Sequence, residues 1–311
     1  MRLVKCPLYT VAAVCAVSIF AQGAVADSPG SERSADQSPK FSLEGVYALA
    51  SARAEWANLQ PADDTDNGNT ATSSSGVGLG GPYFLRSADP VGPGELELKF
   101  VGRYGEPADG DEEWGLDLVA EWGFAENWEF IFEVPVELGN GRVQGNGDIE
   151  EFGFHTKLWD ESDGHPAFAV RNLIRIPTGY HSSGIDYELR GLFSKNCPCS
   201  TCGVRWHLNP WYKSVNGHNN DEARNSLWGV AFGFDVPVCE AVNMVLDYQY
   251  NRGENEGDDE DQLVEIGFDW TLSESRTLGL SGTIDTDGDS GDDYTLGISY
   301  IIKLAAPRMD R

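Results

Sequence analysis

Apolar and polar residues alternate along the segment WEFIFEVPVEL, which runs from Trp128 to Leu138. One side of an extended chain would carry Trp128, Phe130, Phe132, Val134, Val136 and Leu138, and the other would carry Glu129, Ile131, Glu133, Pro135 and Glu137. A period of two predicts a β-strand, because successive side chains of a strand point to opposite faces. The apolar face can pack on the core of a soluble sandwich. It can also meet lipid in a membrane barrel whose lumen receives the carboxylates.

The same alternation recurs in twelve segments of the chain. These segments are 95–103, 114–122, 128–138, 151–158, 168–176, 187–193, 204–212, 228–235, 244–250, 264–270, 278–285 and 294–303. Most of them approach the length needed to cross a bilayer at a tilt, about nine to eleven residues. An even number of strands is also what single-chain bacterial barrels have.

The connections between these segments alternate in kind. The mostly short ones are 125–127, 160–165, 196–202, 239–241 and 273–276, and the longer, more polar ones are 105–113, 139–147, 216–225, 251–261 and 285–293. Short periplasmic turns opposite long outer loops are typical of outer-membrane barrels, as are aromatic residues near strand ends, such as Trp114 and Trp270. The sequence therefore predicts an all-β fold, a 12-stranded antiparallel up-and-down transmembrane β-barrel.

The region before the first strand has a different composition. Residues 1–26 read as an export signal, with Arg2 and Lys5, an apolar stretch and the small residues Ala24-Val25-Ala26. Residues 27–81 are rich in Ser, Asp, Asn, Gly and Thr and predict a mostly disordered periplasmic linker. Within it, residues 43–59 could form a short helix, either docked in the periplasm or plugging the barrel. We expect the barrel to occupy residues 82–304 and a tail to occupy 305–311.

The chain is strongly acidic, with a formal net charge of −28, which becomes −30 once a signal carrying two basic and no acidic residues is removed. Such a charge repels nucleic acid and anionic membrane faces, and no basic patch offsets it. Nucleic acid is therefore excluded as a partner.

Charged residues on the polar faces of the segments are candidates for lining the lumen. They are Glu97, Lys99, Asp117, Glu121, Glu129, Glu133, Glu137, His155, Lys157, Arg171, Arg175, Glu188, Arg190, Arg205, His207, Asp235, Asp247, Glu265 and Asp269. Acids prevail in the second and third segments and in the eighth to tenth, and bases in the fourth to seventh. These charges can line an open pore, or they can pair off and fill the lumen, because buried charges must be paired or hydrated.

Four cysteines follow the signal, Cys197, Cys199, Cys202 and Cys239. In an exported protein they predict disulfides, one from the 197–202 cluster to Cys239 and a second within the cluster. A four-thiolate metal site is the alternative. Asp285, Asp287 and Asp289 resemble a calcium loop, but the glycine offset is wrong for an EF-hand and no Glu closes the site. An acidic outer loop is therefore preferred, and we expect no metal or cofactor.

Several motifs resemble those of the family of outer-membrane transporters called "MetA-pathway of phenol degradation". They are Asp89-Pro90-Val91-Gly92-Pro93-Gly94-Glu95-Leu96-Glu97, Gly145-Asn146-Gly147-Asp148, Ile176-Pro177-Thr178-Gly179 and Leu296-Gly297-Ile298-Ser299-Tyr300. The resemblance covers about residues 81–304. It implies an outer-membrane barrel that moves small, often aromatic, compounds, and it brings no catalytic motif. The chain departs from the family in its cysteine-rich turn and in its tail.

These observations predict a monomeric, porin-like channel or transporter for small solutes in the lipid of the outer membrane, and not an enzyme. One alternative is a structural or adhesive barrel with a closed lumen. Another is a soluble periplasmic β-protein that binds a ligand.

Overall fold

The computed structural model of the chain describes residues 84–107, 113–138, 145–197, 203–216, 223–256, 260–286 and 292–309. The predicted signal, the linker and the possible helix at residues 43–59 lie outside these residues. Among the described residues, no helix is long and apolar enough to cross a membrane.

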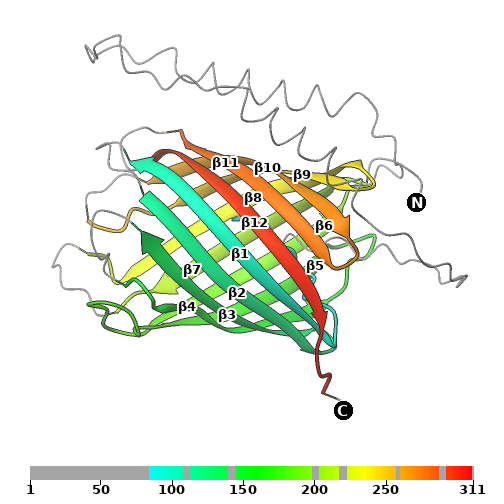
Figure 1. Ribbon diagram of the computed structural model, residues 1–311, viewed down its shortest axis with the longest axis horizontal. Coiled ribbons are helices and arrows are strands. Elements are labelled where there is room, and N and C mark those ends of the chain that lie inside the picture. The colour runs from blue at the N-terminus through cyan, green and yellow to red at the C-terminus, as the bar shows by residue number, and fades with distance from the viewer. Residues whose placement is uncertain are drawn as a thin grey trace, which may run out of the picture. The chain divides into compact units, whose positions relative to one another are not determined.

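Twelve antiparallel strands form one closed barrel, which confirms the predicted fold (Figure 1). Their bounds are β1 Glu95–Pro107, β2 Glu113–Ala125, β3 Trp128–Leu138, β4 Ile149–Trp159, β5 Ala167–Ile176, β6 Asp186–Asn196, β7 Arg205–Ser214, β8 Ser226–Cys239, β9 Val242–Asn251, β10 Asp261–Ser273, β11 Arg276–Asp285 and β12 Asp292–Ala305. Each strand pairs with its neighbours in sequence, and β12 closes the ring against β1, from Glu95 opposite Ala305 to Pro107 opposite Asp292.

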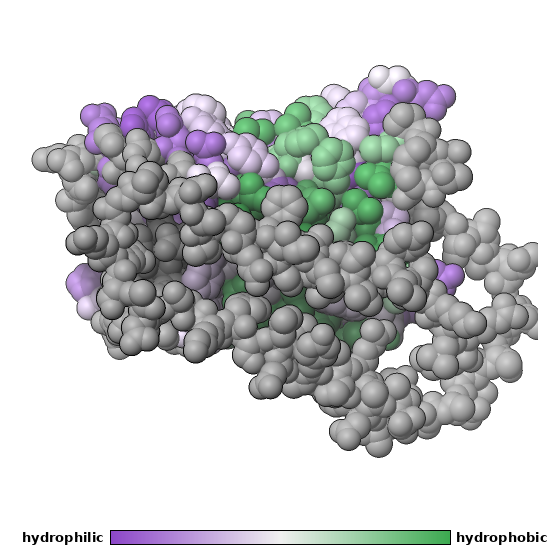
Figure 2. Space-filling model, turned by 90° about the horizontal axis from the view of Figure 1, so that it is seen from above, coloured by the Kyte–Doolittle hydropathy of each residue, from purple (hydrophilic) through white to green (hydrophobic). Residues whose placement is uncertain are grey.

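The alternation in sequence becomes an inner and an outer face of this wall. Phe100, Leu118 and Phe232 point outward and are 43%, 41% and 42% exposed, whereas polar residues of the opposite parity are buried inside. Figure 2 shows apolar residues gathered across the middle of the visible wall and hydrophilic ones toward both ends. A barrel leaves no strand edge unpaired, so an apolar outer belt of this kind suits a hydrocarbon environment.

The two ends of the barrel differ. The short-turn end holds the start of β1, the end of β12 and the turns after β2, β4, β6, β8 and β10. The long-loop end holds the other six connections. At the short-turn end, residues of the tail bind the rim, because Ala306 N donates to Gly94 O (2.7 Å) and Met309 N donates to Phe124 O (2.8 Å).

The ladder between β3 and β4 is short. Only six residue pairs join these strands, from Trp128–Thr156 to Glu133–Glu151, whereas eleven join β2 and β3. Residues Val134 to Leu138 therefore have no strand partner on the β4 side within the described part of the chain. The turn Gly145–Asp148 occupies that position, and we call the boundary between this turn and β3 the seam.

Candidate functional site

The segment from Phe84 to Val91, which precedes β1, lies inside the barrel. Its backbone is bound by inner side chains of strands all around the wall. Phe84 N donates to Glu265 of β10 (3.2 Å), Arg86 N to Asn209 of β7 (2.6 Å), Ala88 N to Ser194 of β6 (2.8 Å) and Val91 N to Glu129 of β3 (2.7 Å). Leu85 and Ala88 are fully buried. We call residues 84–91 the inserted segment.

Asp89 fixes the inserted segment electrostatically. Its carboxylate lies 2.5 Å from Arg205 Nη1 and 3.2 Å from Lys157 Nζ. Partial burial opposes the charge on Asp89, but the Arg205 guanidinium and the Lys157 ammonium outweigh it and hold the pKa of this carboxyl below its usual range. Two of the basic residues predicted to line the lumen are thus engaged by the segment that leads into β1.

A Ser–His–Asp row lies beneath the inserted segment. Ser194 Oγ is 2.8 Å from His207 Nδ1, and His207 Nε2 is 3.6 Å from Asp235 Oδ2. These residue types can support nucleophilic catalysis. Here Ser194 and His207 are both fully buried, and Ser194 Oγ accepts the N–H of Ala88. In this arrangement no solute reaches the hydroxyl, so the row serves to anchor the inserted segment.

A charge network fills the middle of the lumen around Arg171 of β5. Its Nη2 atom lies 2.8 Å from Glu121 of β2 and 3.5 Å from Glu129 of β3, and Nη1 lies 3.6 Å from Glu151 of β4. The Arg171 side chain is 2% exposed. Because β2 and β5 are separated by two strands, the contact to Glu121 crosses part of the lumen.

The network continues around the wall. Lys99 forms an ion pair with Glu121 and lies 3.8 Å from Glu97, which in turn lies 2.8 Å from Lys303. His155 Nδ1 lies 3.6 Å from Glu129, and its Nε2 lies 3.2 Å from Ala88 O. At this level the opposed rows of charge are paired with each other and with the inserted segment, so they fill the lumen.

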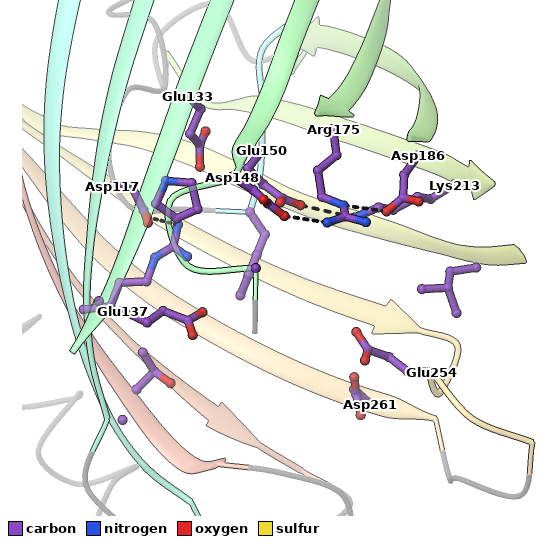
Figure 3. Close-up of a pocket in the computed structure, with 18 of the residues that line it drawn as sticks. Asp117, Glu133, Glu137, Asp148, Glu150, Arg175, Asp186, Lys213, Glu254 and Asp261 are labelled. Carbon is purple, nitrogen blue, oxygen red and sulfur yellow. Dashed lines mark hydrogen bonds and ion pairs between the residues drawn. The ribbon is translucent and has the colours of Figure 1, made fainter. Parts of the chain in front are cut away.

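A cavity of about 940 Å³ opens toward the long-loop end, and we call it the outer cavity (Figure 3). Phe84, at the beginning of the inserted segment, is among its lining residues. Ten acidic and four basic side chains line it: Asp117, Glu133, Glu137, Asp148, Glu150, Asp186, Glu254, Asp261, Glu265 and Asp285, with Arg103, Arg175, Lys213 and Arg224.

Ion pairs engage most of the bases of the outer cavity. Arg103 binds Asp117 (2.7 Å), Lys213 binds Glu150 (3.2 Å), and Arg175 binds both Asp148 (2.5 Å) and Asp186 (2.7 Å), as the dashed lines to Arg175 in Figure 3 show.

Glu133 and Glu254 have side chains that form no hydrogen bond or ion pair with any described residue. The cavity therefore carries excess negative charge.

The other predicted lumen residues also lie on the inner face. Glu188 pairs with Arg190 (2.6 Å). Asp247 is buried directly opposite Glu265 in the β9–β10 ladder, and Asp269 is buried opposite Asn243.

The cysteines require a correction. Cys239 is disulfide-bonded, to a partner outside the described residues, but Cys197 is free. The prediction that Cys197 takes part in a disulfide is therefore wrong. Cys197 N donates to Val204 O (2.8 Å), so this residue extends the β6–β7 ladder.

The described residues contain no group of three or more His, Cys, Asp or Glu side chains that could hold a metal ion. Asp287 and Asp289 of the calcium hypothesis lie outside the described residues, and Asp285 lines the outer cavity.

Sequence reasoning missed several residues of this site. Asp148 and Asp186 immediately precede or open a strand, where alternation gives no clear inner or outer assignment. The inserted segment has no periodicity at all. Its only signal is the apolar pair Phe84-Leu85 just before the Pro- and Gly-rich motif that leads into β1.

No family model matches the chain, and no curated protein matches it in sequence. Solved structures do resemble it. The COG4313 outer membrane channel from Pseudomonas putida F1 has a TM-score of 0.52 at 12% identity, over 70% of this chain and 97% of that one. The NanC porin has a TM-score of 0.47 at 9% identity, over 67% of this chain and all of that one. The likeness to the COG4313 channel supports the fold of an outer-membrane barrel.

Proposed function

We propose that this chain is an outer-membrane channel or transporter for small polar solutes and that it prefers cations. The observation that carries the proposal is the outer cavity, in which carboxylates outnumber bases and the bases are largely engaged in ion pairs. Fixed negative charge in a confined, poorly hydrated space raises the local concentration of cations and lowers that of anions. The resemblance to the phenol-degradation transporters adds small aromatic compounds to the candidate solutes.

Ion selectivity across a planar bilayer tests this proposal. Under a salt gradient the protein should give a reversal potential of cation-preferring sign, and raised salt should weaken it by screening. Replacing Glu254 by Gln should reduce the preference, since its carboxylate forms no ion pair with any described residue. Glu126→Gln, in the exposed turn between β2 and β3 at the other end, is the matched control and should change it little. Anion preference in the wild type would contradict the proposal.

A second candidate function is favoured by the inserted segment. A barrel whose lumen stays closed could serve as a scaffold for its outer loops, and the charge network around Arg171 supports this candidate. The two candidates differ in whether the wild-type protein conducts. If it does not conduct, but Asp89→Ala does, then the inserted segment is what closes the lumen, because Asp89 holds it to Lys157 and Arg205.

A further inference from the structure

Two carboxyl groups meet on the inner wall of the barrel, beside the beginning of the inserted segment. Asp247 of β9 lies directly opposite Glu265 of β10 in the ladder between these strands. Residues opposite each other on one face of a sheet have their Cβ atoms about 5 Å apart. Here the two carboxyl groups come within hydrogen-bonding range of each other. Asp247 is 5% exposed and Glu265 is 1% exposed, so the pair is almost completely withdrawn from water.

No basic side chain of the described residues forms an ion pair with either carboxyl group. Arg86 of the inserted segment attracts Asp247, and Arg103 of β1 attracts Glu265, but both act from a greater distance. Two carboxylates in contact repel each other, and burial strengthens the repulsion. The pair therefore needs a positive charge between its members, which is either a proton or a metal ion.

The hydrogen bonds of the two groups are unequal. Glu265 Oε2 accepts the N–H of Phe84 (3.2 Å), and Ser281 of β11 donates to the same carboxyl group. Both carboxyl oxygens of Asp247, by contrast, are buried and receive no hydrogen bond from the part of the chain that the structure describes. A buried acceptor without a donor is rare in folded proteins and points to a bound water, an ion or a functional role.

A third buried oxygen of this kind lies on the same strand. Gln249 follows Asp247 by two residues and so shares its inner face, and it is 8% exposed. Its Nε2 atom donates to Asn251 Oδ1 (2.6 Å), which identifies Oε1 as the acceptor. Gln249 Oε1 also receives no hydrogen bond within the described ranges. This amide oxygen is an observation independent of the acidic pair, and it too is suited to a cation.

The chemistry of these groups matches a hard divalent cation. Ca²⁺ and Mg²⁺ bind carboxylate oxygens, the carbonyl oxygens of Asn and Gln, and water. Mg²⁺ in particular is often held by only one or two carboxylates and keeps several waters. Two carboxyl groups and an amide therefore suffice for such an ion when water completes its coordination shell.

The outer cavity gives an ion a route to the pair. Glu265 lines this cavity together with Ser281 and Thr283 of β11, and Thr283 lies opposite Glu265 in the β10–β11 ladder. Because acidic side chains outnumber basic ones in the cavity lining, its field concentrates cations beside the pair.

We propose that Asp247 and Glu265, together with Gln249 Oε1, bind one hard divalent cation, Ca²⁺ or Mg²⁺. Because Glu265 also accepts the N–H of Phe84, the bound ion stabilises the contact between the inserted segment and β10. This site goes beyond the proposed channel function, and it does not depend on whether the lumen conducts.

Calcium binding to the purified full-length protein tests the proposal. After treatment with a chelator, isothermal titration calorimetry with calcium chloride should detect a stoichiometric site. Asp247→Asn and Glu265→Gln should each weaken that site by at least about tenfold, the scale on which metal sites respond to the loss of supporting groups. Glu265→Gln keeps an oxygen that can accept the N–H of Phe84, so its effect reports the lost charge.

The matched control is Glu188→Gln, which removes an inner carboxylate that Arg190 already pairs with. It should leave the calcium site unchanged. Calcium should also raise the urea concentration at which the wild type unfolds in lipid vesicles, and it should not do so for Asp247→Asn. Heat-modified migration on gels checks that each variant is folded, and Glu265→Gln serves alone if Asp247→Asn does not fold.

A shared proton is the outcome that would overturn the proposal. In that case calcium finds no stoichiometric site in the wild type, or finds one that both variants retain. The amide of Asn in place of Asp247 would then donate to Glu265 as a protonated Asp247 does, and urea unfolding would not respond to calcium in either protein.

Discussion

Removing the guanidinium of Arg171 should destabilise the barrel more than any other single loss of charge in the lumen. Arg171→Met keeps a side chain of similar length but leaves Glu121, Glu129 and Glu151 without their shared cation. All three lie within 3.6 Å of Arg171, whose side chain is 2% exposed. Breaking a buried ion pair by removing one partner costs about 3–5 kcal/mol, because an uncompensated charge remains in a poorly solvated site. At about 1.4 kcal/mol per factor of ten, the unfolding equilibrium should change by roughly a hundredfold to several thousandfold.

Urea titration of the protein in lipid vesicles, followed by tryptophan fluorescence, measures this change. Arg190→Met is the control, because its partner Glu188 lies at 2.6 Å but both side chains are 16% exposed, and such a pair contributes about 1 kcal/mol or less. Adding Glu121→Gln to Arg171→Met should recover part of the lost stability, since it removes one of the carboxylates left without a cation. If Arg171→Met costs no more than Arg190→Met, water already fills this level of the lumen and the network is not what closes it.

Three further predictions follow from single residues. Phe132→Arg, on the outer face near the middle of β3, should cost about 2–4 kcal/mol in lipid, whereas Glu133→Ala on the inner face should leave insertion intact; equal loss in both would contradict the assignment of faces. Because the pKa of Asp89 is lowered in the folded state, its hold on the inserted segment should persist above the ordinary carboxyl range near pH 4 and weaken as the pH falls through its lowered pKa. The access of a paramagnetic quencher to a spin label at Ser87→Cys should therefore rise in acid, and Asp89→Asn should remove that pH dependence. Cys197 should react with maleimide in the non-reduced protein, and Cys197→Ser should remove one reactive thiol per chain without changing migration on non-reducing gels.

The strands could be predicted because their physical cause is local. Alternation along one strand, such as Trp128 to Leu138, already states which face meets lipid and which meets the lumen. The inserted segment has no such signal, because its position depends on backbone N–H groups that meet side chains of β3, β6, β7 and β10. These contacts join residues about 40 to 180 positions apart, and no periodicity of the sequence predicts them.

The residues of the candidate site could also be predicted only in part from the sequence. The inward charges of the strands were identifiable from parity, but their division between a filled middle and an open outer cavity was not. That division depends on which partners lie across the lumen, as when Arg171 reaches Glu121 past two strands. The seam was equally hidden, because β3 alternates without interruption to Leu138 although its ladder with β4 stops at Glu133.

The position of the inserted segment also constrains the order in which the protein folds. Its partners lie on strands from both halves of the barrel, so the full set of hydrogen bonds cannot exist before the curved sheet brings β3 and β10 to face each other. Closure itself joins β1 to β12 across about two hundred residues, the kind of long-range pairing that slows folding. The tail then bonds Gly94 and Phe124 at the same rim. Residues 84–94 therefore complete their contacts among the last, although they leave the ribosome before every strand.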